Sequence, residues 1–366
     1  MEQAPVLSVA CAVPYALDTV PNQRFRWEQW APLMRDEGVE IEFIPFCDRA
    51  IQDARARGRS LEAAARVVAR WPAWALEMSR TRRSGLLVVH RNAALAGPPL
   101  AELALHALGV PFVYDFDDAI FLPPPRGDSW LRRQIRADWR VATLARRAAL
   151  VTAGSPFLAT WARQFTPHVE VWPTTIAMSA YAERPRAAAP PGAKPVIGWS
   201  GSVSTGQCLE PLLPVLRELQ RKEPFHLLVV GAQLDLGGME GECIPWTAGS
   251  ELAALHRMDI GLMPLPDTDF TRGKCALKAL QYLAVGTPAV VSDVGVNAEA
   301  VPDGQCGFVV RTDQEWIEAL TRLLRDPALR AQMGQAGRAH VAARYSAEVW
   351  APRLAARLRT LASTRS

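Results

Sequence analysis

The chain has 366 residues, of which 49% are hydrophobic and 21% are charged, and its formal net charge is +4. This length favours two globular domains, and the composition is that of a protein able to bury large cores. No run of about 18 apolar residues free of charge occurs, so the sequence predicts no membrane-spanning helix. The N-terminus lacks the basic region of a cleaved signal peptide, and we therefore expect a cytoplasmic protein.

The positions of the cysteines and of the basic residues indicate what kinds of site the chain could hold. The six cysteines form no Cys-x-x-Cys pair and no cluster with zinc spacing, which indicates reduced structural thiols and no metal site. The first half is basic through arginine alone, and this excess is either a solvated face or a contact with an anionic membrane surface. Two of the chain's lysines, Lys274 and Lys278, are four residues apart.

The first half alternates between short apolar runs and amphipathic stretches, which is typical of a parallel sheet covered by helices on both faces. Strands are predicted at residues 6–13, 39–46, 86–90, 111–114, 150–153 and 169–172. Helices are predicted at residues 24–37, 61–78, 100–108 and 130–149.

A segment rich in Pro and Ala, residues 181–194, has the composition of a linker. The alternation then begins again, with strands predicted at residues 196–199, 225–231, 244–246, 260–265, 288–292 and 307–311. Helices are predicted at residues 209–221, 250–258, 274–285, 314–324, 327–345 and 346–361. The sequence thus predicts an α/β protein with two doubly wound, Rossmann-like domains and a cleft between them, where ligands of open sheets bind.

The loop from Ser200 to Gly206 follows a predicted strand and precedes a predicted helix. Gly201 and Gly206 allow close approach of backbone to a ligand, and the hydroxyls of Ser202, Ser204 and Thr205 can donate hydrogen bonds. Helix N-termini bind phosphate through unpaired N–H groups. An ordinary capped turn is the alternative. The spacing matches neither a dinucleotide fingerprint nor an ATPase phosphate loop.

The second segment is a predicted helix in which Lys274, Lys278 and Gln281 share one face. Two lysines four residues apart repel each other unless an anion lies between them. Arg272 and Gly273 precede the helix, so N-terminal amides would add to the positive field. We interpret this face as an anion site, with a solvated helix face as the alternative.

The loop after the strand at residues 288–292 offers amides and polar groups. Gly295, Val296 and Asn297 lie in it, and we expect this loop to hydrogen-bond sugar hydroxyls. The alternative is a polar loop that caps the next element.

The segment from Lys278 to Glu299, which includes Gly-Thr-Pro-Ala-Val-Val-Ser-Asp-Val-Gly-Val-Asn-Ala-Glu, resembles family 4 glycosyltransferases of the GT-B fold. Asp303-Gly-Gln-Cys-Gly-Phe-Val-Val and the segment from Asp326 to Ser346 share the resemblance, which is specific over about residues 194–350. Val113-Tyr-Asp-Phe-Asp-Asp-Ala-Ile-Phe and Arg24-Phe-Arg-Trp-Glu-Gln-Trp are similar to a bacterial branch of the family.

The resemblance implies two domains that face a central cleft, at residues 1–185 (acceptor side) and 186–345 (donor side), and a terminal helix, 346–366, that packs back on the first. The family has two glutamates eight positions apart, at the positions of Gly273 and Gln281. Gln281 can still hydrogen-bond a ribose, whereas Gly273 offers only backbone. Lys274 and Lys278 resemble a local substitute for the family's basic pair at the diphosphate.

The first half supplies candidates for the acceptor side. Asp117 and Asp118 follow a predicted strand, and His90 and Arg91 stand at the end of another. We expect them to face the cleft, with Asp117 or Asp118 near the acceptor hydroxyl, although a capped turn or a structural histidine is the alternative for each. The catalytic candidates are therefore Lys274, Lys278, Asp117, Asp118 and His90.

These residues predict a glycosyltransferase of polysaccharide biosynthesis. It would move a sugar from a UDP- or GDP-type donor to a hydroxyl of a saccharide, lipid-linked or small-molecule acceptor. The resemblance implies a retaining reaction without a metal or other cofactor, and nucleic acid is not an expected partner. We expect cytoplasmic location, with a contact at the inner membrane face left open. A nucleotide-sugar epimerase and a non-catalytic nucleotide-sugar-binding protein are the alternatives.

Overall fold

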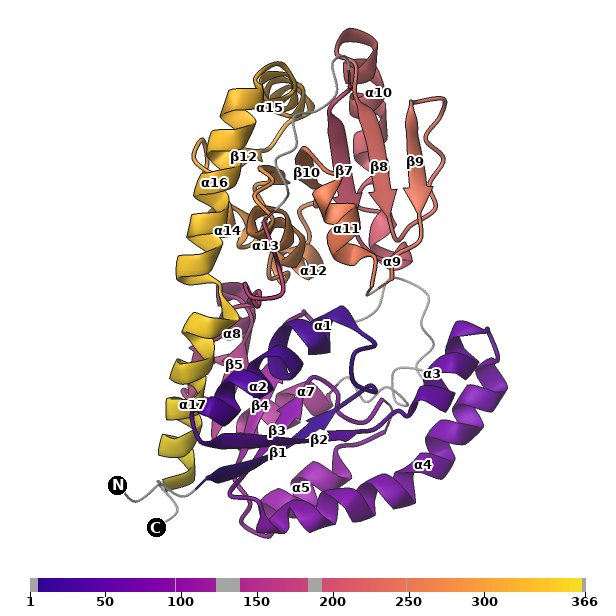
Figure 1. The fold of residues 1–366 in the computed structure, drawn as a ribbon. Coiled ribbons are helices and arrows are strands. Elements are labelled where there is room, and N and C mark those ends of the chain that lie inside the picture. Colours follow the sequence, from indigo (N-terminus) through magenta and orange to yellow (C-terminus); the bar gives the residue numbers. More distant parts are fainter. Residues whose placement is uncertain (1–5, 96, 123–138, 184–192, 248, 364–366) are drawn as a thin grey trace. The chain divides into compact units, whose positions relative to one another are not determined.

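The computed structural model describes residues 6–95, 97–122, 139–183, 193–247 and 249–363 (Figure 1). The chain forms two compact units, one of residues 1–174 with 350–366 and one of residues 175–349. Most of the predicted linker, residues 184–192, lies outside the described residues. The boundary expected between residues 185 and 186 therefore stays a prediction.

The first unit is built on a parallel sheet of six strands in the order β2-β1-β3-β4-β5-β6 (Figure 1). Its strands are β1 (Leu7–Val13), β2 (Val39–Pro45), β3 (Leu86–His90), β4 (Phe112–Phe116), β5 (Leu150–Ala153) and β6 (Val169–Val171). Residues of β3, β4 and β5 are all buried, as the continuous apolar runs of a covered parallel sheet require. The strand order reverses between β1 and β3, which is where such a sheet opens a crevice for ligands.

Helices cover this sheet. They are α1 (Pro21–Gln23), η1 (Arg24–Glu28), α2 (Gln29–Asp36), α3 (Arg49–Ala56), α4 (Ser60–Arg80), η2 (Thr81–Arg83), α5 (Leu100–Ala107), α7 (Arg140–Arg147) and α8 (Pro156–Ala162). The sequence did not predict α3 or α8. The first nine residues of the helix expected at residues 130–149 lie outside the described residues, and the remaining part contains α7.

The helix predicted at residues 24–37 has an irregular start. It is a π-helical turn, η1, followed by α2, and Arg26 within it has non-helical dihedrals of φ −128° and ψ −105°. The Arg26 side chain is fully buried. The β4 strand also extends two residues beyond the prediction, so Asp115 is a buried residue of the sheet and not part of a loop.

The second unit has a parallel sheet in the order β12-β11-β10-β7-β8-β9. Its strands are β7 (Val196–Ser200), β8 (His226–Val230), β9 (Gly241–Ile244), β10 (Ile260–Met263), β11 (Ala289–Ser292) and β12 (Gly307–Val310). In chain order this is the doubly wound 3-2-1-4-5-6 arrangement, whose switch point lies between β7 and β10. The prediction of two doubly wound units is confirmed.

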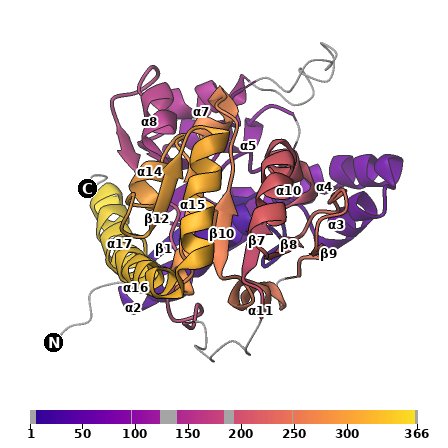
Figure 2. The same ribbon diagram turned by 90° about the horizontal axis from the view of Figure 1, so that it is seen from above.

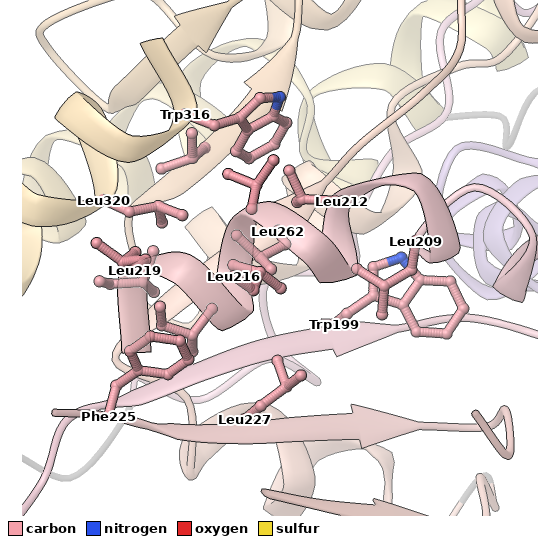
Figure 3. Packing of buried hydrophobic residues seen from close by; sticks show 14 of the residues in the cluster. Trp199, Leu209, Leu212, Leu216, Leu219, Phe225, Leu227, Leu262, Trp316 and Leu320 are labelled. Atoms are coloured by element: carbon pink, nitrogen blue, oxygen red, sulfur yellow. The ribbon is translucent and has the colours of Figure 1, made fainter. Parts of the chain in front are cut away.

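Helices lie on both faces of the second sheet. They are α9 (Val203–Gly206), η3 (Glu210–Leu212), α10 (Leu213–Lys222), α11 (Glu251–His256), α12 (Asp269–Arg272), α13 (Leu277–Ala284), α14 (Asn297–Ala300), α15 (Asp313–Arg325) and α16 (Pro327–Arg344). Figure 2 shows α10 and α15 together over the sheet. Leucines of α10 and Trp316 of α15 pack there on Trp199, Leu227 and Leu262 (Figure 3).

Two predicted helices of this unit begin later than expected. The helix predicted from Leu209 begins as a 3₁₀ turn and becomes α-helical at Leu213, so the loop after β7 contains only the short α9. The helix predicted from Lys274 begins at Leu277. Lys274 therefore lies in the turn between α12 and α13 and does not share a helical face with Lys278.

The terminal helix α17 (Ala347–Ser363) belongs largely to the first unit, as predicted. Arg357 of α17 forms an ion pair of 2.6 Å (Nε–Oε1) with Glu170. All six cysteines are free thiols. Within the described residues, no helix has the length and apolarity that a bilayer crossing requires.

Candidate active site

The strongest candidate cluster of the second unit lies at the carboxyl end of β7, beside the switch point of the sheet. The amine of Lys278, on α13, lies 4.1 Å from the ring centroid of Trp199 and 3.4 Å from the Thr205 hydroxyl. Gly201 completes this cluster, because a Cβ there would lie 2.7 Å from the Lys278 Nζ. The structure thus brings Lys278 together with Gly201 and Thr205, which the sequence placed in a different segment.

The loop that carries Gly201 is held by backbone packing that only glycine permits. A Cβ on Gly201 would lie 2.3 Å from the Trp199 ring, and one on Gly231, whose φ is +87°, would lie 2.0 Å from the Gly201 carbonyl. Ser202 and Thr205 then cap the short helix α9, with the Ser202 N–H donating to the Thr205 hydroxyl at 2.9 Å. The Ser202 side chain is exposed, and the Thr205 hydroxyl lies beside Lys278. The Ser204 side chain lies outside the described residues.

Lys278 is a cation in an environment that disfavours its charge. Burial, with a further contribution from the charge of Lys274, lowers the pKa of Lys278 to about 7. Among the described residues no carboxylate forms an ion pair with it. A bound anion would restore the charged form, so the geometry and the electrostatics both favour an anion beside this amine.

Lys274 does not lie on the helical face of Lys278 that the sequence predicted, but on the turn before α13. Its amine lies over the Phe270 ring at 4.6 Å, a cation–π contact on the turn before α13. This turn ends at Ala276, which adopts a left-handed conformation (φ 54°, ψ 20°) unusual for a residue with a Cβ. The conformation breaks the helix between the two lysines, yet they remain close enough to interact electrostatically.

Arg272 and Asn297 are both engaged in contacts within the protein. The Arg272 guanidinium donates to both oxygens of Asp267, at 2.6 and 2.9 Å, which leaves it a poorer phosphate ligand than we expected. The Asn297 side chain is buried and donates to the Ser292 carbonyl at 2.9 Å, so it anchors its loop. A direct contact of either side chain with a donor stays a prediction.

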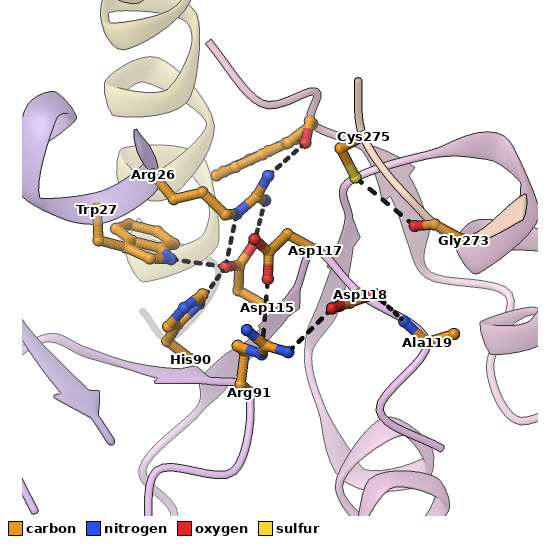
Figure 4. Close-up of polar contacts among 11 residues, drawn as sticks. Arg26, Trp27, His90, Arg91, Asp115, Asp117, Asp118, Ala119, Gly273 and Cys275 are labelled. Carbon is orange, nitrogen blue, oxygen red and sulfur yellow. Dashed lines mark hydrogen bonds and ion pairs between the residues drawn. The ribbon is translucent and has the colours of Figure 1, made fainter. Parts of the chain in front are cut away.

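The backbone segments that carry Arg272 and Gly295 nevertheless pack against each other. Gly295 has a φ of +61°, and a Cβ on it would lie 2.8 Å from the Arg272 carbonyl. The loop of Gly295 and Val296 therefore packs against the backbone of Arg272, next to Gly273. Cys275 in the same turn is a buried thiol whose Sγ lies 3.9 Å from the Gly273 carbonyl (Figure 4), in keeping with a structural role.

Gln281 stands one turn after Lys278 on α13 and is buried. Its amide nitrogen donates to Glu251 at 2.8 Å and to the Tyr181 hydroxyl at 2.9 Å. The sequence did not indicate Glu251 or Tyr181, because their proximity is a product of tertiary structure. Among nearby aromatic residues of this unit, Trp199 and Phe225 are fully buried in the core, whereas Trp246 is partly exposed.

In the first unit, polar residues gather where β3 and β4 end (Figure 4). Asp115 accepts hydrogen bonds from Arg26 Nε at 2.9 Å, Trp27 Nε1 at 2.9 Å and Thr152 Oγ1 at 2.7 Å, and its Oδ2 lies 2.7 Å from His90 Nδ1. A second contact with Arg26 makes that pair bidentate. Burial disfavours the Asp115 charge, but Arg26 and the His90 hydrogen bond outweigh it and hold the pKa well below its usual range.

This network corrects the interpretation of His90. The His90 side chain is fully buried and its Nδ1 is bound to Asp115. It is therefore not placed as a group that faces a cleft, and its position fits the structural alternative. One signal pointed to the Arg26 and Trp27 contacts, an arginine placed directly between two aromatic residues in a helical stretch.

Asp117 and Asp118 lie beyond the end of β4, beside Arg91. Arg91 Nε is 3.6 Å from Asp117 Oδ1, and Arg91 Nη2 is 3.5 Å from Asp118 Oδ2. Arg91 follows β3 with a φ of +53°, a conformation that costs energy for any residue with a Cβ and is often found at functional sites. The two carboxylates and Arg91 are partly exposed and stay the candidates for acceptor contacts.

No group of three His, Cys, Asp or Glu side chains suited to a metal ion occurs among the residues that the structure covers. The cluster at the end of β7 offers the Lys278 amine and backbone amides, and such groups can bind an anionic group and stabilise developing negative charge.

Comparison with known proteins agrees with this geometry. Residues 194–326, which carry the β7 loop and both lysines, match the family model described as glycosyl transferases group 1. The match supports a place in that family. The curated relatives include D-inositol 3-phosphate glycosyltransferases of Pseudarthrobacter chlorophenolicus (34% identity over 34% of this chain and 29% of the relative) and Nocardia farcinica (28%, over 48% and 44%). The aligned part thus spans less than half of these relatives.

Solved structures match nearly the whole chain at low identity. Sucrose-phosphate synthase from Thermosynechococcus elongatus superimposes with a TM-score of 0.71 at 15% identity, covering 98% of this chain and 100% of that one. Anabaena Alr3699/HepE in complex with UDP and glucose gives a TM-score of 0.66 at 15% identity, covering 97% and 99%. At this identity the likeness shows the fold, which is the GT-B fold that the sequence predicted.

Proposed function

We propose that the chain is a glycosyltransferase that transfers a sugar from a nucleotide diphosphate sugar to a hydroxyl group. The observation that carries this proposal is the partly buried Lys278 amine at the carboxyl end of β7, next to Gly201 and Thr205. This is the place where a doubly wound sheet binds phosphate groups. The family match covers the same segment.

The chemistry follows from what Lys278 and its neighbours can stabilise. When the bond between the sugar and the diphosphate breaks, negative charge accumulates on the leaving diphosphate and positive charge on the sugar ring. Lys278, Lys274 and the loop amides would stabilise the leaving group, as preorganised donors do at other developing anions. We propose that these groups suffice without a metal and that the transfer is retaining, as the family resemblance implies.

The acceptor would lie on the side of the first unit. Asp117 and Asp118 are partly exposed carboxylates beyond β4, and Arg91 sets their positions. A carboxylate there can orient an acceptor hydroxyl or take up its proton. We propose a saccharide, lipid-linked or small-molecule hydroxyl as the acceptor and UDP or GDP as the nucleotide. UDP is the nucleotide bound in the Anabaena structure.

The direct test is incubation with a panel of UDP- and GDP-sugars, with and without simple saccharide acceptors. We expect release of the nucleoside diphosphate from one of these donors, faster when an acceptor is present. Conversion of a donor into an isomeric sugar nucleotide without transfer would instead identify an epimerase. Binding without any turnover would identify the non-catalytic alternative, for which Gly273 at a glutamate position of the family is the motivating feature.

We further propose that the first unit contacts an anionic membrane surface through α4. Leu61, Val68 and Leu76 lie along one side of this helix and are 89%, 71% and 56% exposed. Their spacing of seven and eight residues, with exposed alanines between them, forms an apolar stripe. Exposed arginines stand at both ends, among them Arg59 and Arg80. This combination is typical of helices that lie in a lipid interface.

The α4 proposal predicts co-sedimentation with vesicles of phosphatidylcholine and phosphatidylglycerol, and weaker binding to phosphatidylcholine alone. The triple variant L61S/V68S/L76S should lose about tenfold or more in partitioning, since each buried CH₂ contributes about 0.8 kcal/mol. The control is serine at exposed leucines elsewhere in the unit, L100S/L108S. Equal sedimentation of the triple variant and wild type would refute the role of α4.

A further inference from the structure

A buried carboxylate lies beside the predicted donor site. Glu251, at the start of α11, is 8% exposed and accepts three hydrogen bonds. Its Oε1 accepts from Gln281 Nε2 at 2.8 Å and from Trp246 Nε1 at 3.3 Å, and its Oε2 accepts from the Tyr181 hydroxyl at 3.4 Å. The Tyr181 hydroxyl in turn accepts from Gln281 Nε2 at 2.9 Å. These contacts tie together three separate segments of the second unit.

The network decides which way the Gln281 amide points. A carboxylate can only accept hydrogen bonds, so the nitrogen of the amide must face Glu251 and its oxygen must face away. The second N–H of Gln281 donates to the Tyr181 hydroxyl, which in turn donates a hydrogen bond to Glu251. Both donors of the amide are therefore engaged within the protein, and the oxygen is the atom that Gln281 can offer to a ligand.

The position of Gln281 on α13 relates this oxygen to the anion site. Lys278 and Gln281 are three residues apart and share one side of the helix, separated by about 4.5 Å along its axis. In a nucleoside diphosphate, the ribose is joined directly to the first phosphate. A diphosphate held at Lys278 can therefore place its ribose next to Gln281.

We propose that Glu251 and Tyr181 are positioning residues that fix Gln281 as a hydrogen-bond acceptor for the vicinal hydroxyls of a ribose. This inference rests on the proposed function of the donor site. It makes the donor a ribonucleotide and excludes a 2′-deoxyribonucleotide such as a deoxythymidine diphosphate sugar. Gln281 lacks the charge that a glutamate would have, and Glu251 supplies a negative charge one hydrogen bond further from the ligand.

The test compares the affinities of UDP, 2′-deoxy-UDP and 3′-deoxy-UDP by isothermal titration calorimetry. Wild type should prefer UDP by about tenfold over each deoxy form, because a lost hydrogen bond to a buried acceptor is worth about 1.4 kcal/mol. In E251Q the Gln281 amide can turn over, so the preference should fall to about threefold or less. The exposed carboxylate variant E218Q should keep the wild-type preference and serves as the control.

A second pair of variants separates positioning from folding. Q281E places two carboxyl groups in contact, which disfavours the charge on each, and should weaken UDP binding. E251Q/Q281E restores one carboxylate and one amide, with the acceptor now at position 281, and should recover the preference for UDP. Circular dichroism confirms that each variant is folded, and the double variant tests the proposal if E251Q alone is not.

The outcomes distinguish this inference from the donor site itself. Equal affinity of wild type for UDP and both deoxy forms, or an unchanged preference in E251Q, would overturn the role of the network. If UDP binding in that case still depends on Lys278, the donor site stands. If K278A binds UDP as wild type does, the donor-site assignment fails instead.

Discussion

Replacement of Lys278 by alanine should lower the rate of sugar transfer by about 10²–10³-fold, the usual effect of removing one preorganised donor from a developing anion. The amine lies 3.4 Å from the Thr205 hydroxyl in the β7 loop. K278R keeps a positive charge and should retain part of the activity, although a guanidinium does not fit the same space. Turnover of the best UDP- or GDP-sugar is the measurement.

The control is K222A, since Lys222 is an exposed lysine that pairs with Glu218 on α10. It should leave turnover unchanged. A K278A enzyme as active as K222A would show that Lys278 does not hold the leaving group.

The pKa of Lys278 adds a pH dependence with a defined sign. Without ligand this pKa is about 7, below its ordinary value of 10.5, so the amine loses its proton as the pH rises through 7. A diphosphate prefers the protonated amine, and affinity for UDP-glucose should therefore weaken above pH 7, by at most about tenfold per pH unit. The stability of the unliganded protein should instead rise with pH in this range. Between about pH 7 and 10.5 the Lys278 amine is protonated in the unfolded chain but not in the folded one. K278R should show neither dependence.

The second large effect concerns stability. D115A should destabilise the first unit by about 3–5 kcal/mol, because it leaves the buried Arg26 guanidinium without its counter-charge. The pair is wholly buried and bidentate, and Trp27, Thr152 and His90 complete the hydrogen bonds around the carboxylate (Figure 4). Urea unfolding measured by circular dichroism gives the difference. The depressed pKa also means that Asp115 stabilises the fold above about pH 4 and that this contribution is lost in stronger acid.

Two further variants define the cause. R26M/D115L removes both charges and should recover much of the lost stability, since buried pairs can be replaced by apolar residues at little cost. D118N changes a partly exposed carboxylate nearby and should cost about 1 kcal/mol or less. If D115A is no less stable than D118N, the buried network does not hold the unit together.

Most strands were predictable because they are short apolar runs, and such runs in a covered parallel sheet leave a direct signal in the sequence. β9 (Gly241–Ile244) is not such a run, and it begins three residues before the strand predicted at residues 244–246. The helix around Lys278 was harder. Alanine favours helices, so nothing at Ala276 reveals the left-handed turn that delays α13 until Leu277. The spacing of Lys274 and Lys278 predicted an anion site, which we still propose at Lys278, although the two lysines do not share a helix face.

The contacts between distant segments could not be predicted. Glu251 and Gln281 are 30 residues apart, and Arg26 and Asp115 are 89 apart, so only the folded chain pairs them. His90 shows the converse error. Its place at a strand end indicated a cleft residue, whereas the buried Asp115 carboxylate holds it in the core. A strand-end position locates the edge of a sheet but does not decide which side chains reach solvent.

The central claim is that the diphosphate of the donor binds at Lys278, and a crystal structure of the protein with UDP tests it most directly. The account predicts phosphate oxygens within about 3 Å of the Lys278 amine, close to the amides of the Gly201 loop, and ribose hydroxyls on the oxygen of Gln281. A UDP molecule bound elsewhere, with Lys278 still packed against Trp199 and Thr205 and touching no phosphate, would contradict it.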